Sequence, residues 1–314
     1  MTAAAPSGAA PVPDAEAPLA GSRTASSRAA RRLLRQPVTI ASAVVLTAIF
    51  AFGAFVPRLA PQGWNSIDLS ARWRNHPPVL SGWHLFGTDN IGRDVLVRTL
   101  YALHASEQTA LLAALFATVL GVAIGGTAGY AGGWSDAVLM RAADLIGTFP
   151  ALMLLLAAYV FLQPVTVARA TLVFALYLWI PVARIVRANV ASLRESEFVQ
   201  AARSLGASDL RILLRHLLPN ATGTIVVAAT SLLGQVIMLE ATVEFFGLGV
   251  SSQIQPTLGN LIGDVTQGGI GPFSPIGLGW WTWACPAALL VVVLVCANLL
   301  GDGVDAALRP ASPR

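Results

Sequence analysis

Apolar stretches close to the length of a membrane-spanning helix alternate with polar segments along the chain. Five of them cover about residues 38–56, 110–130, 145–162, 170–186 and 222–243, and a sixth follows Trp280, Trp281 and Trp283 and ends near residue 300. A helix needs about 20 mostly apolar residues to cross a bilayer. The pattern therefore predicts an all-α, polytopic membrane protein with six transmembrane helices.

The segments between these spans divide the chain into three parts. Residues 1–36 combine an Ala-, Pro- and Ser-rich stretch with a cluster of arginines, which predicts a disordered cytoplasmic tail. Residues 37–106 are expected to hold the first transmembrane helix and a long external loop, and residues 107–310 the transmembrane core. The basic flank and first apolar run also fit a signal peptide, but the run is long for one and lies far from the N-terminus.

Six spans place both termini and the polar segment 195–219 on the same side of the membrane. This side collects an excess of arginine, including Arg184, Arg187, Arg194, Arg203, Arg211 and Arg215 in or just before the polar segment. Cytoplasmic loops of membrane proteins carry such an excess. We therefore expect the N- and C-termini in the cytoplasm, and we interpret the basic residues as a sign of orientation in the membrane rather than of nucleic-acid binding.

Composition supports the membrane class and excludes some chemistry. Hydrophobic residues make up 55% of the chain and charged residues 11%, against about 25% charged in a typical soluble domain. All 20 basic residues are arginine, so the chain lacks the lysine that a P-loop requires. If ATP is used, another polypeptide binds it.

Cysteine and histidine give no sign of a metal site or of catalysis. Cys285 and Cys296 lie in one apolar segment, where packing residues are expected. The four histidines show no metal-ligand spacing. We therefore expect neither catalytic nor metal-binding residues in this chain.

The polar segment 195–219 predicts two short helices joined by a hinge. Gly206 is placed to end the first helix in the left-handed conformation that a side chain would penalise. Pro219 then stops the second helix or opens the next one. One apolar face of the first helix combines Phe198, Ala201, Ala202 and Leu205.

The pair Ala201 and Ala202 lets another surface approach the helix backbone closely. A short, stiff helix–turn–helix that projects from a membrane protein is suited to transmitting movement between partners. An amphipathic loop that lies on anionic lipid is the alternative interpretation.

Three other stretches carry features that the structure can test. Residues 84–103 predict an amphipathic helix at the membrane surface with Asp94 in its first turn, ahead of a span whose glycines suit close helix contact. Arg141 and Asp144 are three residues apart on one helical face and are expected to pair. Glu240 and Glu244 close the fifth span, where they line a transport pathway or vestibule, or are simply exposed at the outer interface.

The polar segment resembles the EAA loop of bacterial ABC-importer permeases. The resemblance is carried by Ala201, Ala202, Gly206 and Pro219 at the family spacing, with Gln200 where the motif has its glutamate. In that family the loop forms a coupling helix that docks on the ATP-binding subunit. The resemblance implies an ATPase-coupling loop made of Glu197, Gln200, Ala201, Ala202, Gly206, Ala207, Asp209 and Pro219.

Other segments resemble the dipeptide/oligopeptide class of these permeases, in the subunit given the letter C. They are residues 85–95, 240–249, 256–260 and 298–303, and the resemblance extends over about residues 30–310. Leu258 stands where the family pattern has tryptophan, and Glu244 where we expect a small polar residue.

The resemblance implies a type I ABC-importer permease fold in the bacterial plasma (inner) membrane. It implies a non-catalytic permease subunit that forms half of the pathway, with a second, different permease subunit, two ATP-binding subunits and an external substrate-binding protein as partners. ATP and magnesium would be bound by the partners, and this chain itself would contact lipid and hold no cofactor. Peptides are the expected substrate, with nickel chelates, glutathione or another small solute as alternatives. A gradient-driven secondary transporter and a membrane enzyme are the rival classes.

Overall fold

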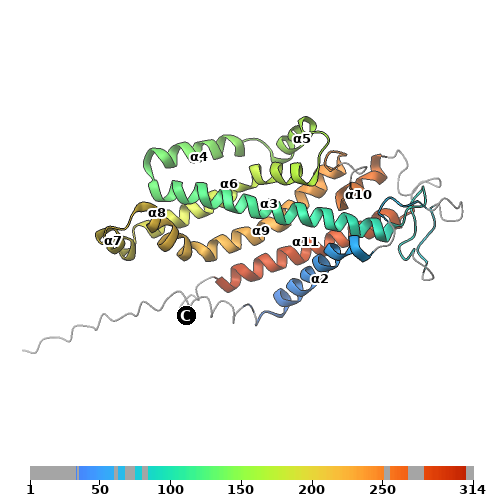
Figure 1. Cartoon of the computed structure of the whole chain (residues 1–314), viewed down its shortest axis with the longest axis horizontal. Helices are drawn as coiled ribbons and strands as arrows, with labels where there is room; N and C mark the ends of the chain where they lie inside the picture. The colour runs from blue at the N-terminus through green and yellow to red at the C-terminus, as the bar shows by residue number, and fades with distance from the viewer. Residues whose placement is uncertain are drawn as a thin grey trace, which may run out of the picture.

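The computed structural model describes residues 33, 35–59, 63–67, 75–79, 84–250, 255–267 and 279–308. These residues fold almost entirely into helices (Figure 1), which confirms the all-α prediction. The predicted tail lies outside the described residues, apart from its last few positions. The helices are α2 (Pro37–Leu59), α3 (Val95–Ala131), α4 (Gly133–Gly147), α5 (Ala151–Phe161), α6 (Val167–Arg194), α7 (Glu197–Ser204), α8 (Asp209–Ile212), the π-helix η2 (Leu213–Leu217), α9 (Leu218–Phe245), α10 (Leu258–Gln267) and α11 (Trp281–Leu308).

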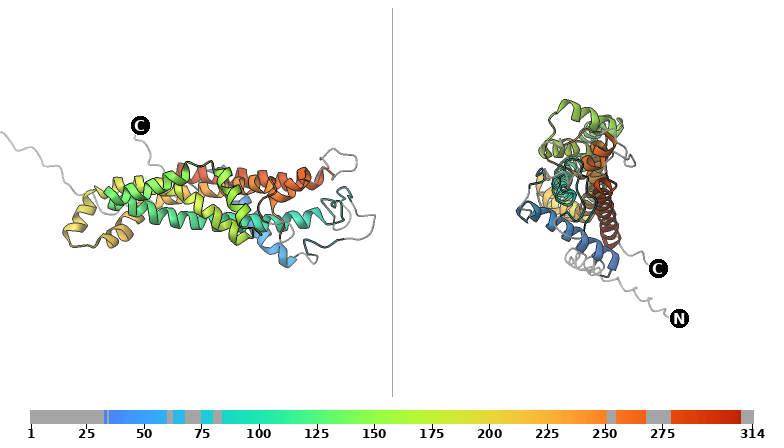
Figure 2. Two further views of the ribbon diagram at one scale, coloured as in Figure 1. Left: turned by 90° about the horizontal axis from the view of Figure 1, so that it is seen from above. Right: turned by 90° about the vertical axis from the view of Figure 1, so that its right-hand side faces the viewer.

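Five helical stretches are long and apolar enough to cross a membrane, and there are six if the bent pair α4 and α5 counts as one span. This count agrees with the six predicted spans. The long helices run roughly along the longest dimension of the molecule, as the two views in Figure 2 show. The short helices α7 and α8 lie at one end, and α10 and the segment before α3 lie toward the other (Figure 1).

The third predicted span, residues 145–162, is wrong as a single helix. The chain bends by 83° between α4 and α5. The break falls at Thr148, Phe149 and Pro150, and Pro150 precedes the first residue of α5 with an extended ψ of 127°. Proline disfavours a helical conformation at the residue before it and lacks an N–H for the helix ladder, so α4 cannot continue through this point.

The helix expected at residues 84–103 and the second span are one continuous helix, α3. It has 37 residues and is therefore about 55 Å long at 1.5 Å per residue, well beyond the ~30 Å of a bilayer core. Asp94 is its N-cap rather than a residue of its first turn, and the Asp94 side chain accepts a hydrogen bond from the Val97 N–H at 2.8 Å. The capping carboxylate satisfies an N–H that would otherwise have no partner.

Close contact between α3 and α6 depends on glycines. A Cβ atom added to Gly129 would lie 2.6 Å from the carbonyl oxygen of Arg187, and one added to Gly125 would meet the backbone of Ala183. Gly121 faces Val182 in the same way. The predicted small-residue contact is confirmed, and the two backbones approach more closely than any side chain would permit.

Candidate functional site

Helix α7 begins at Glu197, whose carboxylate lies in the first turn, where the helix dipole favours negative charge. Gly206 follows the helix with φ of +80°, in the left-handed region. The turn is closed by hydrogen bonds from Gly206 N to Arg203 O at 2.9 Å and from Ala207 N to Ala202 O at 3.1 Å. The predicted left-handed end of the helix at Gly206 is therefore confirmed, and its role as a hinge stays a prediction.

The faces of α7 differ from the prediction in one respect. Val199 is fully buried and Ala202 is 8% exposed, and both join the main hydrophobic core. Ala201 is exposed together with Phe198, and Leu205 is 88% exposed. Ala202 therefore holds α7 on the body of the protein, and only the other three residues of the predicted apolar face are available to a partner.

The second predicted helix of the loop is not a separate element. Residues 209–245 form one helical stretch through α8, η2 and α9. Pro219 lies in the first turn of α9 and does not stop the helix. The turn before it is widened, so that the Leu218 N–H donates to the Leu213 carbonyl five residues back. Leu213 and Leu217 are buried on this stretch, whereas Leu210 and Leu214 are exposed.

The polar residues of the loop have local roles. Gln200 is exposed and donates a hydrogen bond from its side-chain amide to the Glu195 carbonyl at 3.2 Å. Ala207 is half-buried against the core. Asp209 accepts a hydrogen bond from the Tyr130 hydroxyl of α3 at 2.5 Å. This contact could not be predicted from the sequence, because 79 positions separate the two residues.

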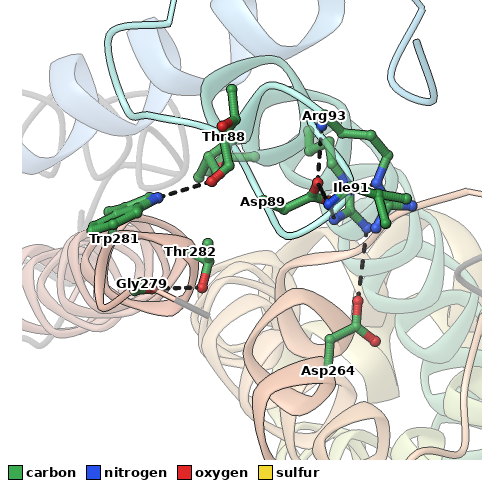
Figure 3. A network of polar contacts seen from close by, with 11 residues as sticks. Thr88, Asp89, Ile91, Arg93, Asp264, Gly279, Trp281 and Thr282 are labelled. Carbon is green, nitrogen blue, oxygen red and sulfur yellow. Dashed lines mark hydrogen bonds and ion pairs between the residues drawn. The ribbon is translucent and has the colours of Figure 1, made fainter. Parts of the chain in front are cut away.

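A buried polar network lies at the opposite end of α3 (Figure 3). One carboxylate oxygen of Asp89 accepts from Arg93 Nε at 2.6 Å and from Arg98 Nη1 at 2.9 Å. The other accepts from the backbone N–H groups of Ile91 and Arg93 at 3.1 and 2.9 Å. Arg98, only 6% exposed, also lies 3.7 Å from the carboxylate of Asp264 on α10. The network joins the start of α3 to α10.

Two further contacts fix the segment before α3. The indole N–H of Trp281, at the start of α11, donates to the Thr88 carbonyl at 3.0 Å. His84 Nδ1 lies 2.8 Å from the carboxylate of Asp94. Burial raises the pKa of Asp264, and the nearby Arg98 opposes this shift. The buried Asp89, Asp94 and Arg98 of this region thus each have a polar partner, and Asp264 is half-exposed.

Glu240 and Glu244 are 2% and 3% exposed, so the expectation that they are simply exposed at the outer interface is wrong for this chain. Glu244 fills the space beside Gly259, where an added Cβ would lie 2.6 Å from its carboxylate oxygen. One oxygen of Glu240 and both of Glu244 make no hydrogen bond of good geometry within the part of the chain that the structure describes. A role of this pair in a pathway stays a prediction.

The predicted pairing of Arg141 with Asp144 is also replaced by another contact. Asp144 binds Arg184 of α6 at 2.8 Å, and Asp136 binds Arg187 of the same helix. These pairs join α4 to α6, because Asp136 and Asp144 both reach arginines of that helix. Across the described ranges of the chain, no three His, Cys, Asp or Glu side chains converge on a position that could hold a metal ion.

The structure thus defines a multi-pass helical membrane protein. A helical elbow, made of α7, the turn at Gly206 and α8, is exposed at one end. A family described as "Binding-protein-dependent transport system inner membrane component" matches residues 117–311. A second family, the "N-terminal TM domain of oligopeptide transport permease C", matches residues 24–78. The chain belongs to the family of inner-membrane components of binding-protein-dependent transport systems. It is a membrane-embedded, non-catalytic permease component of an ABC transporter.

Relatives of this family align with nearly the whole chain. The oligopeptide transport system permease protein OppC of Mycobacterium tuberculosis (strain H37Rv) is 34% identical over 290 residues, which cover 90% of this chain and 93% of that protein. The dipeptide transport system permease protein DppC of Bacillus subtilis is 32% identical over 282 residues, with 89% and 84% covered. A putative peptide permease protein of Brucella suis is 34% identical over 284 residues, with 90% of each chain covered.

Proposed function

We propose that this chain forms one half of the translocation pathway of a bacterial ATP-driven importer, and that the pathway carries peptides. The relatives named above for oligopeptide and dipeptide transport support the substrate class, because they align with this chain over almost its full length. A second permease subunit of different sequence would supply the other half, and an external binding protein would deliver the peptide.

The observation that carries the coupling role is the outward-facing apolar surface of α7. Phe198, Ala201 and Leu205 are exposed beside the left-handed turn at Gly206. Apolar side chains on a projecting helix are typical of a surface that a partner covers. In this proposal one of two ATP-binding subunits, which hold ATP and magnesium, receives this surface in a groove.

Gln200 determines which interactions can hold the docked helix. Its amide is neutral and bonds to the Glu195 carbonyl, so it cannot form the ion pair that a glutamate at this position could make. The contact would therefore depend on shape and apolar area around Ala201 and Leu205. Arg203, Arg211 and Arg215 are exposed around the elbow, and this excess of positive charge supports a cytoplasmic elbow and cytoplasmic termini in the bacterial plasma membrane.

The proposal is tested by reconstituting the complex, purified through a tag on this chain, into proteoliposomes and measuring ATP-dependent uptake of a labelled library of short peptides. Ala201→Trp places a bulky side chain on the docking face and is expected to abolish retention of the ATP-binding subunits and uptake. Ala142→Trp makes the same change at an exposed position of α4 and should leave both intact. Uptake without any co-purified ATPase would overturn the proposal.

Membership of the ABC-permease family counts against the rival candidate, a gradient-driven transporter, although Glu240 and Glu244 are buried ionisable groups of the kind that can serve ion coupling. This candidate predicts that a protonophore stops uptake and that ATP depletion does not. The proposed importer shows the opposite dependence.

A further inference from the structure

We propose that Tyr130 is a positioning residue that ties the elbow to α3, so that movement of α7 during ATP-driven docking is passed on to the long helix. The inference rests on the proposed function and extends it to a residue outside the loop. Tyr130 is the penultimate residue of α3, and its hydroxyl lies between two residues of the elbow.

The contacts of Tyr130 bring together three segments that follow one another in the chain. Its hydroxyl donates to the Asp209 carboxylate at 2.5 Å and accepts from Arg203 Nη2 at 3.4 Å. The Arg203 guanidinium also lies 5.5 Å from the centre of the Tyr130 ring, within the range of a cation–π interaction. Arg194, at the end of α6, donates to the Tyr130 carbonyl at 3.2 Å.

These contacts connect residues before and after Gly206 to one side chain, that of Tyr130. Arg203 lies on α7, ahead of Gly206, and Asp209 opens α8 behind it. An added Cβ at Gly206 would have nothing within 4 Å, so no packing at that position braces the turn beyond its own hydrogen bonds. Val199 and Ala202 anchor α7 in the core, and the Tyr130 contacts add a polar tie across the turn to the end of α3.

Helix α3 is suited to receive movement from α7. It is unbroken over 37 residues and is locked to α6 by the glycine contacts at Gly125 and Gly129. Its other end carries Arg98, which is held by Asp89 and Asp264. A displacement at Tyr130 therefore moves the buried network at the far end as part of one rigid element.

Measurements can distinguish a contact that only stabilises the fold from one that passes movement from α7 to α3. The hydrogen bond between Tyr130 and Asp209 is solvent-exposed, and exposed polar contacts contribute little to folding stability. Loss of the hydroxyl should therefore leave the fold and the assembly intact. What should change is the number of peptides transported for each ATP hydrolysed.

The test uses Tyr130→Phe in the whole complex, with the labelled short-peptide library as the transport probe. The variant keeps the aromatic ring and removes only the hydroxyl. We expect unchanged retention of the ATP-binding subunits, an unchanged unfolding temperature, and roughly two- to fivefold fewer peptides per ATP, the change that corresponds to one exposed polar contact. Tyr101→Phe, the same change at a half-buried position of α3, is the matched control and should transport normally.

A double-mutant cycle with Asp209→Ala sharpens the test. If Tyr130 and Asp209 act through one contact, the double variant should lose no more coupling than the worse single variant. Should Tyr130→Phe be poorly folded, Arg203→Gln probes the same polar tie from the α7 side.

Two results would overturn the inference. The first is unchanged transport per ATP in Tyr130→Phe, while the unaltered complex shows ATP-dependent uptake. The second is a loss of uptake that comes only from lost ATP-binding subunits. If the unaltered complex itself shows no ATP-dependent uptake, the proposed function fails and not only the role of Tyr130.

Discussion

The two ends of the molecule differ in which side chains they bury and which they expose. At one end the buried side chains of Asp89 and Arg98 are paired, and the half-exposed Asp264 lies beside Arg98. Around α7, apolar side chains such as Leu205 are exposed, and a glycine turn follows them. Buried charges fix a structure because separating them is costly, whereas exposed apolar residues gain free energy only when a partner covers them. One end is thus built for rigidity and the other for contact, with α3 between them.

The largest expected effect comes from breaking the rigid end. Arg98→Met leaves Asp89 and Asp264 without their shared buried cation. Asp89 keeps Arg93 and two backbone N–H groups, so we expect the free energy of unfolding to fall by about 1.5–3 kcal/mol, measured as lost thermal stability of the protein in detergent. Arg141→Met removes an exposed arginine of α4 and should change stability by less than ~0.5 kcal/mol. Equal stability of the two variants would show that the buried network does not hold this end.

A smaller effect is expected at the hinge of the contact end. Gly206→Val forces a β-branched residue into a backbone with φ of +80°, at a cost of roughly 1–2 kcal/mol. The elbow should rearrange, and peptide uptake per ATP should fall while the transmembrane helices stay folded. Gly206→Asn is the matched control, since asparagine tolerates this conformation. Normal uptake by the valine variant would contradict the hinge assignment.

The sequence predicted the contact end better than the rigid end, for a physical reason. The elbow is local: Glu197, Gly206 and the spacing of apolar residues determine α7 and its turn within a few positions. The network depends on contacts such as that of Arg98 with Asp264, which only the packed helices bring together. For the same reason the inward turn of Ala202 could not be predicted, because it depends on which face of α7 meets the core.

Continuity of the helices was equally hard to predict. Nothing in the pattern excludes a break between residues 103 and 110, yet α3 passes through without one. Pro150 and Pro219 are both prolines near the start of an apolar run, but the first coincides with a sharp bend and the second with a widened helical turn. Neighbouring helices decide between these outcomes, and a single sequence does not specify them.

A still smaller effect on stability is expected from Leu205→Asp. Leu205 is 88% exposed, so the free energy of unfolding should change by less than ~0.5 kcal/mol. Retention of the ATP-binding subunits should nevertheless be lost, because a charge then lies on the apolar docking face. Ser204→Asp, at the adjacent exposed position, is the control. A destabilised variant would show that Leu205 packs within the chain rather than against a partner.

The smallest effect concerns pH at the rigid end. Burial raises the pKa of Asp264 in the folded protein above its ordinary value of 3.8, so the folded state binds a proton more readily than the unfolded state. The resulting stability is fully present below the ordinary pKa and is lost as pH rises through the raised value. Asp264→Asn should flatten this part of the stability–pH curve, measured by thermal unfolding between about pH 4 and 7. An unchanged curve would contradict the assignment to Asp264.

The side of the membrane on which the elbow lies, and the subunit that it contacts, can be measured by site-specific crosslinking. Leu205→Cys is introduced after Cys285 and Cys296 are replaced by alanine, and intact cells are treated with a thiol crosslinker or with a membrane-impermeant maleimide. We predict a crosslink from position 205 to an ATP-binding subunit and protection from the impermeant reagent. Labelling of position 205 from outside the cell, with no crosslinked ATPase, would contradict the account.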